Sequence, residues 1–135
     1  MGAKLDSDTI KVMTLFESVT GARLRDCVVD DNILFIVQPN QSGKAIGKNG
    51  ANIKKIQTLL KKNAVVKEFD EDVVQFVKNM INVEVDSIEE VEGIIEIKCS
   101  DFKKRNVLIG RDKHNLNNLE EVVKRHFNIE GIKVL

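Results

Sequence analysis

The chain has 135 residues, 42% of them hydrophobic, which is enough to form the core of one ordinary domain or of two small ones. Charged residues make up 31%, and 21 Lys and Arg balance 21 Asp and Glu to a formal net charge of +0. This composition argues against long disordered tracts, and no apolar run approaches the roughly 20 residues that cross a bilayer. The chain also starts without an apolar signal-peptide core, so we expect a cytoplasmic protein with no membrane contact.

In the first half of the chain, apolar periodicity predicts six elements. The first is a helix over residues 8–19, with Ile10, Met13 (or Leu15) and Phe16 directed toward a core. It is followed by two strands, a short helix, a longer helix and a strand, at residues 23–29, 33–37, 42–46, 51–62 and 65–69.

The second half repeats the same order of elements. A helix at 73–81 leads to strands at 83–88 and 93–99, helices at 102–108 and 116–127, and a strand at 131–134. The equivalent glycines, Gly47 and Gly110, are 110 − 47 = 63 positions apart, nearly half the chain. We therefore expect an α+β protein of two domains, residues 1–70 and 71–135, each a three-stranded sheet covered by helices. All six phenylalanines fall at positions typical of a core: Phe16, Phe35, Phe69, Phe76, Phe102 and Phe127.

Charge is divided unequally between the halves. Residues 1–70 hold 11 Lys and Arg against 8 Asp and Glu, whereas residues 71–135 hold 10 against 13, so the balances are +3 and −3. A partner with a phosphate chain should therefore be attracted to the first half, and the acidic region 84–96 is a poor surface for it. From residue 32 to residue 67 there is no carboxylate but there are seven lysines: Lys44, Lys48, Lys54, Lys55, Lys61, Lys62 and Lys67.

The most informative segment is 46–53, with the sequence IGKNGANI, a glycine turn between two predicted helices. Without side chains at Gly47 and Gly50, the backbone can approach a sugar-phosphate chain closely. The next helix contributes its N-terminus, where free N–H groups and the macrodipole favour phosphate oxygens. Base selection would come from the groove between this helix and the neighbouring strand. The candidate RNA-binding residues are Gly47, Lys48, Asn49 and Gly50, followed by Lys44, Ile53, Lys54 and Lys55.

This segment resembles the KH family, whose mark is Ile-Gly-x-x-Gly-x-x-Ile between two helices, and the match is complete. The order of elements is similar to the prokaryotic, type II, KH arrangement. Two such units without a linker resemble the KH region of NusA-like transcription factors, above all the short archaeal ones. The resemblance implies that each unit clamps about four nucleotides of single-stranded RNA. It further implies a role in transcription elongation or termination, with RNA polymerase as a second candidate partner.

The second turn departs from the motif. Residues 109–116 read IGRDKHNL, so the first glycine is kept while Lys113 stands where the second glycine belongs. Because Asp112 repels phosphate and the Lys113 side chain crowds the backbone, we expect a weaker clamp. It should bind RNA mainly when the first unit already holds it, through effective concentration. Gly110, Arg111 and Lys113 form the second-rank set of candidate residues.

No segment predicts catalysis: we find neither a phosphate-binding Walker loop nor a nucleophile motif. Cys27 and Cys99 lack zinc-site spacing, and we expect both to be buried and reduced. The sequence thus predicts a non-enzymatic protein without metal, cofactor or small-molecule substrate. Two alternatives stay open: an RNA-binding role in ribosome or RNA maturation, and a protein-docking adaptor that uses its acidic second half as the contact surface.

Overall fold

The structure is a computed structural model that describes residues 7–135. The expectation that the chain starts without a signal-peptide core concerns residues 1–6, which lie outside this range. The described chain divides into two compact units, of which the first ends at Asp70 and the second runs from Glu71 to Leu135. Each unit is described by itself below. The predicted α+β class is confirmed, because each unit consists of a three-stranded sheet with helices.

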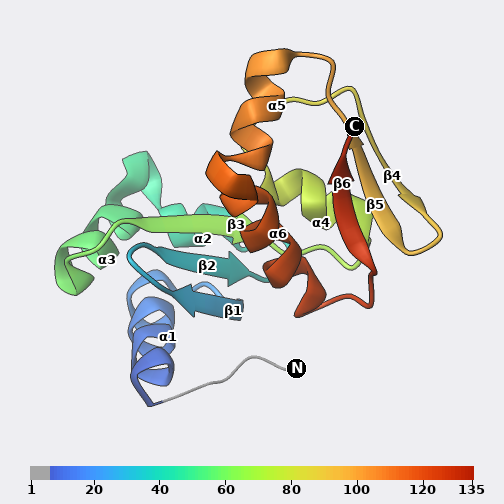
Figure 1. The fold of residues 1–135 in the computed structure, drawn as a ribbon. Helices are drawn as coiled ribbons and strands as arrows, with labels where there is room; N and C mark the ends of the chain where they lie inside the picture. The colour runs from blue at the N-terminus through green and yellow to red at the C-terminus, as the bar shows by residue number, and fades with distance from the viewer. Residues whose placement is uncertain (1–6) are drawn as a thin grey trace. The chain divides into compact units, whose positions relative to one another are not determined.

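The first unit has its strands in the order β1-β2-β3 (Figure 1). Strand β1 is antiparallel to β2, and β2 is parallel to β3. A parallel pair needs a crossover, which helices α2 and α3 provide, and the glycine turn lies within this crossover. The elements are α1 (Ser7–Thr20), β1 (Leu24–Val29), β2 (Ile33–Val37), α2 (Ser42–Ile46), a 3₁₀ turn (Lys48–Gly50), α3 (Ala51–Leu60) and β3 (Ala64–Glu68).

The core of the first unit lies between the sheet and its helices. Phe16 of α1 stacks on Phe35 of β2, with ring centroids 4.1 Å apart. Ala45 of α2 and Ile56 of α3 are fully buried in the same cluster, which also takes in Cys27 of β1. Both helices that flank the glycine turn are therefore anchored by buried side chains, and the turn is held between two fixed ends.

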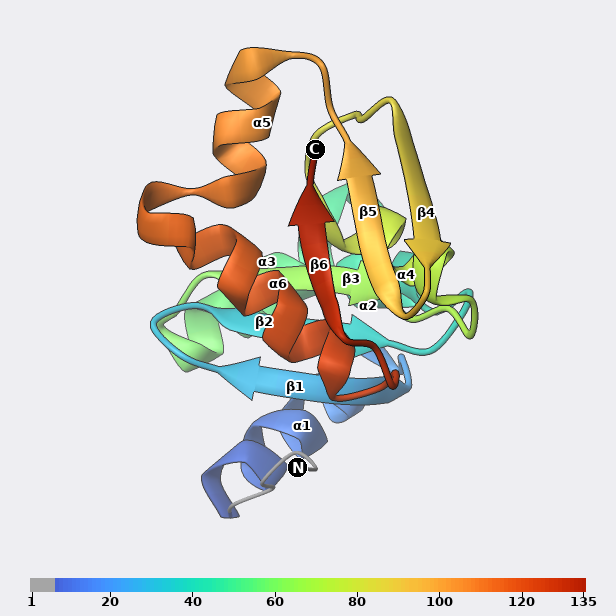
Figure 2. The same cartoon turned by 45° about the vertical axis from the view of Figure 1, so that its right-hand side comes forward.

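The second unit repeats this topology, with strand order β4-β5-β6 (Figure 2). Strand β4 is antiparallel to β5, and β5 is parallel to β6. Its buried side chains include Phe76 of α4, Ile95 and Ile97 of β5, and Val123 of α6. The elements are α4 (Val73–Met80), β4 (Ser87–Val91), β5 (Ile94–Lys98), α5 (Phe102–Ile109), a 3₁₀ turn (Arg111–Lys113), α6 (His114–Lys124) and β6 (Gly131–Val134).

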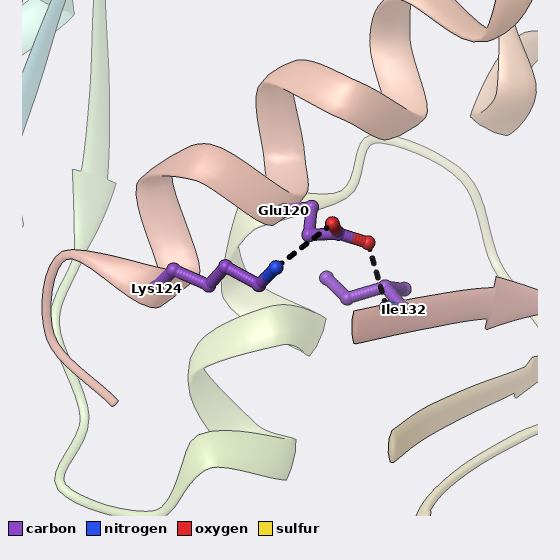
Figure 3. Close-up of polar contacts among 3 residues, drawn as sticks. All are labelled: Glu120, Lys124 and Ile132. Atoms are coloured by element: carbon purple, nitrogen blue, oxygen red, sulfur yellow. Dashed lines mark hydrogen bonds and ion pairs between the residues drawn. The ribbon is translucent and has the colours of Figure 1, made fainter. Parts of the chain in front are cut away.

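Helix α6 is tied to strand β6 by one carboxylate (Figure 3). The main-chain N–H of Ile132 donates to Glu120 Oε2 at 2.9 Å, while Lys124 Nζ lies 3.2 Å from Glu120 Oε1. A Cβ at Gly131 would lie 3.2 Å from Glu120 Oε2, so a larger residue there would press on this contact. The carboxylate fixes α6 along β6 and with it the turn that precedes the helix.

Two predicted core residues are exposed. Ile10 is 49% exposed and Phe102 is 73% exposed. Each lies six residues before the side chain that is buried on the same helix, Phe16 in α1 and Leu108 in α5. Six residues correspond to about 120° around an α-helix, so these side chains point away from the core. The prediction was wrong because it assumed that every apolar residue of these helices faces the core.

The prediction of a strand at residues 83–88 was also wrong in its position. Strand β4 spans Ser87–Val91, and Val91 pairs with Ile94 across a two-residue turn. Glu92 and Gly93 both have positive φ, 51° and 82°, which is the backbone that joins antiparallel strands most tightly. This turn sets the register of the hairpin and shifts the strand toward the C-terminus. The other predicted elements lie within three residues of the observed ones.

Candidate nucleic-acid interface

The first glycine turn closes helix α2 and opens helix α3. The Gly47 N–H donates to the Gly43 carbonyl at 2.9 Å, and the Gly50 N–H donates to the Gly47 carbonyl at 3.1 Å. Gly47 has φ 76° and ψ 172°, while Asn49 (φ 55°) and Gly50 (φ 74°) are both left-handed. Three positive φ values within four residues define a sharp bend.

The two glycines of this turn are required for different reasons. A Cβ at Gly47 would lie 2.9 Å from the main-chain nitrogen of Asn52, a distance that real Cβ atoms essentially never show. A Cβ at Gly50 would meet nothing nearer than Lys54 Cε at 3.8 Å. Gly47 is therefore demanded by packing within the protein. Gly50 is favoured only by its positive φ, and it leaves open backbone at the surface.

Asn52 fastens the turn and was not identified from the sequence. Its side-chain Nδ2 donates to the carbonyl of Lys44 at 2.7 Å, across the bend from α3 to α2. The same bond recurs in the second unit, where Asn115 Nδ2 donates to the Val107 carbonyl at 2.8 Å. Both the donors and the acceptors are 63 positions apart. That repeat, visible in the sequence as two aligned asparagines, is the signal that could have found them.

The N-terminus of helix α3 has no side-chain cap and no acidic residue in its first turn. Helices α4 and α5 differ, because Asp72 accepts from Val74 N and Asp101 accepts from Lys103 N and Lys104 N. The first N–H groups of a helix need acceptors, and the macrodipole there favours an anion. The end of α3 that meets the glycine turn is thus suited to a phosphate oxygen.

The lysines that surround the turn project into solvent, as predicted. Ile56 is fully buried and Leu60 is partly buried, so they hold α3 on the core. Ile53, a candidate residue, is half-buried beside them. Lys67 of β3 differs from the rest of the lysine set, because burial lowers the pKa of its ammonium group. The exposed candidates are Lys44, Lys48, Asn49, Lys54 and Lys55.

A hollow of about 670 Å³ lies along α3 and reaches the turn between β1 and β2. Lys54, Thr58 and Lys61 line it at the i, i+4, i+7 spacing of one helix face. Lys62 Nζ donates to the carbonyl of Asp30 at 2.8 Å, which ties the helix end to the strand turn. Lysines therefore continue from the glycine turn along α3, a length of about 15 Å at 1.5 Å per residue, and Asp31 is the one carboxylate residue that lines the hollow, at the turn between β1 and β2.

The second turn has the same backbone as the first. Gly110 has φ 72° and ψ 176°, and Asp112 and Lys113 have φ values of 53° and 62°. A Cβ at Gly110 would lie 2.9 Å from the main-chain nitrogen of Asn115. Arg111 and Lys113 are exposed, and a hollow of about 490 Å³ lies beside the turn. The residue at the second glycine position has therefore changed without a change in the shape of the turn.

The sequence model of the KH domain family matches residues 13–93, more than half of the chain. The chain belongs to the KH domain family. A "probable transcription termination protein NusA" of Methanococcus vannielii is 30% identical over all of this chain and 81% of its own length. A protein of the same name from Halobacterium salinarum is 27% identical over 99% of both chains. The predicted resemblance to NusA-like KH proteins is confirmed.

A solved structure supports the same assignment for this KH protein. The crystal structure of APE1850 superimposes with a TM-score of 0.77 and 27% sequence identity, over 97% of this chain and 100% of the other.

No group of three or more His, Cys, Asp or Glu within residues 7–135 could hold a metal ion. Over the same range no helix combines the length and apolar character needed to cross a membrane. Cys27 and Cys99 are both buried, as predicted, and neither forms a disulfide.

Proposed function

We propose that this KH protein binds single-stranded RNA at the first glycine turn and along helix α3, and that it acts in transcription elongation or termination as a cytoplasmic, non-enzymatic factor. The observation that carries the proposal is the bare backbone of Gly50 at an uncapped helix N-terminus, within a window without carboxylates. The transcription role is supported by the names of the archaeal relatives. RNA polymerase is accordingly a candidate protein partner.

Each group at the turn has a distinct task in this proposal. The open surface at Gly50 lets a phosphodiester approach the first N–H groups of α3 without meeting a side chain. Lys48 adds a mobile positive charge on the turn, and Lys54 continues the attraction one helical turn further on. Contacts of this kind supply affinity and depend on salt, but they carry little sequence information. Bases would be read in the groove beside Ile53.

We further propose that residues 1–70 and 71–135 are each a type II KH domain and that the second binds RNA more weakly. Its turn presents the carboxylate of Asp112 and the Cβ of Lys113 where the first turn presents an amide and a glycine. Arg111 and Lys113 offset part of the repulsion. The second turn then contributes chiefly when RNA is already held by the first.

The binding claim is tested by two matched double variants. Lys48→Asp with Asn49→Asp should weaken binding of an unstructured uridine oligonucleotide by about tenfold or more, because two carboxylates replace a phosphate-attracting surface. Arg111→Asp with Lys113→Asp should reduce affinity less. Fluorescence anisotropy at two salt concentrations measures both. Unchanged affinity in the first variant would rule out the clamp, and a larger loss in the second would reverse the ranking of the turns.

The transcription claim has its own test. The full chain, tagged and expressed in an archaeal cell, should crosslink to nascent RNA and co-purify with RNA polymerase. Enrichment of ribosomal particles without polymerase would instead assign the same RNA-binding surface to ribosome maturation. Because both results require RNA contact, a failure of the transcription claim is distinguishable from a failure of the clamp.

A further inference from the structure

A second surface, acidic where the surface along α3 is basic, lies in the second unit, between helix α4 and strand β4. A hollow of about 720 Å³ is lined there by α4, by the irregular segment 81–86 and by the start of β4. Strand β4 is an edge of its sheet (Figure 1). An edge strand next to a groove exposes main-chain N–H and C=O groups that another extended segment can pair with. The apolar part of the lining consists of Val74, Ile81, Val83, Val85 and Ile88.

The hollow follows from a difference between the two units. Helix α1 ends at Thr20, which corresponds to residue 20 + 63 = 83 in the repeat, whereas α4 already ends at Met80. Strand β4 begins at Ser87, the position that corresponds to Leu24 at the start of β1, so the early end of α4 alone lengthens the irregular segment. The intervening residues run without regular structure, and they separate the end of the helix from the edge strand.

The charges on this edge are not balanced within the sheet. Glu89 of β4 pairs with Glu96 of β5, and Glu96 pairs with Lys133 of β6. Like charges directly opposite each other on neighbouring strands destabilise a sheet. Lys133 flanks Glu96 on one side, but Glu89 is exposed at the edge. A cation on an added strand opposite Glu89 would flank this pair of carboxylates on its second side, as Lys133 flanks it on the first.

The wider surroundings are acidic as well. Lys78 of α4 and Lys98 of β5 bring positive charge to this region. Between these two lysines, from residue 79 to residue 97, the chain has no Lys, Arg or His. The same stretch contains six carboxylates, which repel a phosphate chain and attract a basic one: Glu84, Asp86, Glu89, Glu90, Glu92 and Glu96.

We propose that this surface docks an extended basic segment of a protein partner, which adds to the sheet beside β4 as a fourth strand. Main-chain pairing with an edge strand supplies affinity in such complexes, and alternate side chains supply specificity. Ile88 and Glu90 share the face of Ile95 and Ile97, so an apolar residue of the segment enters the hollow beside Ile88. On the other face of the added strand, Lys or Arg lies opposite Glu89.

A short synthetic peptide of alternating valine and lysine is the probe. In the isotope-labelled full chain it should shift the amide signals of residues 81–91 and leave those of residues 47–55 in place. Glu89→Lys should lower the affinity for the peptide by about fivefold or more, because the charge pair with a peptide lysine is lost. This variant also relieves the Glu89–Glu96 repulsion, so it is expected to stay folded. The matched control is Glu121→Lys, a reversal of another exposed carboxylate, on α6, which should leave affinity nearly unchanged.

Several results would overturn the proposal. One is that the peptide shifts no amide signals of residues 81–91. Another is that Glu89→Lys and Glu121→Lys lower its affinity equally. Equal binding by a peptide of lysine alone would show that the apolar hollow is not used. Shifts at 81–91 on addition of a uridine oligonucleotide would assign the surface to nucleic acid. Self-association of the free chain that Glu89→Lys abolishes would identify a second copy, not a partner, as the occupant.

Discussion

Residues 47–50 and 110–113 form the same turn from different amino acids. Asn49 and Asp112 have φ/ψ values of 55°/27° and 53°/33°, and Gly50 and Lys113 have 74°/17° and 62°/22°. In both, the first glycine packs against the main chain of the asparagine five residues later. The comparison teaches that the shape of the turn depends on this glycine and this asparagine, while the residues between them are free to vary.

What differs between the turns is the chemistry that they present to a ligand. Both turns precede a helix without a side-chain cap. The first offers one lysine, an amide and a glycine. The second offers an arginine, a carboxylate and a lysine side chain at the equivalent places. An incoming phosphate would therefore meet backbone at the first turn and charged side chains of both signs at the second. The two turns have the same shape but differ in how freely a phosphate can reach the backbone. For this reason we rank the first turn above the second.

The largest effect is expected from a methyl group at the first glycine. Gly47→Ala should lower the free energy of unfolding by about 3 kcal/mol, because it combines a positive φ with a clash against the main chain of Asn52. Gly110→Ala should cost a similar amount. Gly50→Ala, which meets open space, should cost only about 1 kcal/mol for the left-handed conformation. Urea denaturation measures all three, and equal costs at positions 47 and 50 would contradict the division of roles.

A smaller effect is expected from the asparagines. Asn52→Ala removes the bond to the Lys44 carbonyl and should cost about 1 kcal/mol, as should Asn115→Ala in the second unit. Only Asn52→Ala should also strongly reduce affinity for a uridine oligonucleotide, since it loosens the first turn, which we expect to bind RNA more tightly than the second. Equal losses of affinity in the two variants would mean that both turns clamp RNA alike.

A double variant provides the control for this pair. Asn52→Ala in a Gly47→Ala background should not restore stability, because the main-chain nitrogen 2.9 Å from the added Cβ remains. Recovery of stability would show that the side chain of Asn52, and not its backbone, excludes a larger residue at position 47.

The repeat and the order of elements could be predicted from the sequence because apolar periodicity and the paired glycines are local signals. Strand β4 was misplaced although the repeat gives its position: the predicted strand 23–29 shifted by 63 is 86–92, and β4 spans Ser87–Val91. The local apolar pattern of residues 83–88 misled the prediction, because it does not show the positive φ of Glu92 that sets the hairpin turn. Phe102 and Ile10 were misplaced for another reason: periodicity shows that a helix is apolar, but the sheet decides which side is buried.

The candidate site was only partly predictable for the same physical reason. Glycines and lysines at 47–55 are visible as a motif and a charge window. The bond from Asn52 to Lys44 joins residues eight positions apart across a bend, so it follows from the folded turn and not from helical or strand spacing. The hollow beside α3 likewise depends on the turn between β1 and β2 meeting the end of the helix.

The smallest effect is expected from making the second turn resemble the first. Asp112→Asn with Lys113→Gly removes the carboxylate and exposes backbone before α6, while the retained Gly110 and Asn115 preserve the shape. Affinity for a uridine oligonucleotide should rise by only about threefold, because the backbone becomes accessible while the lost repulsion of Asp112 is offset by the lost attraction of Lys113. Asp112→Asn alone should raise it at least as much if charge governs binding. If Lys113→Gly alone accounts for the whole gain, access to the backbone is the property that separates the two turns.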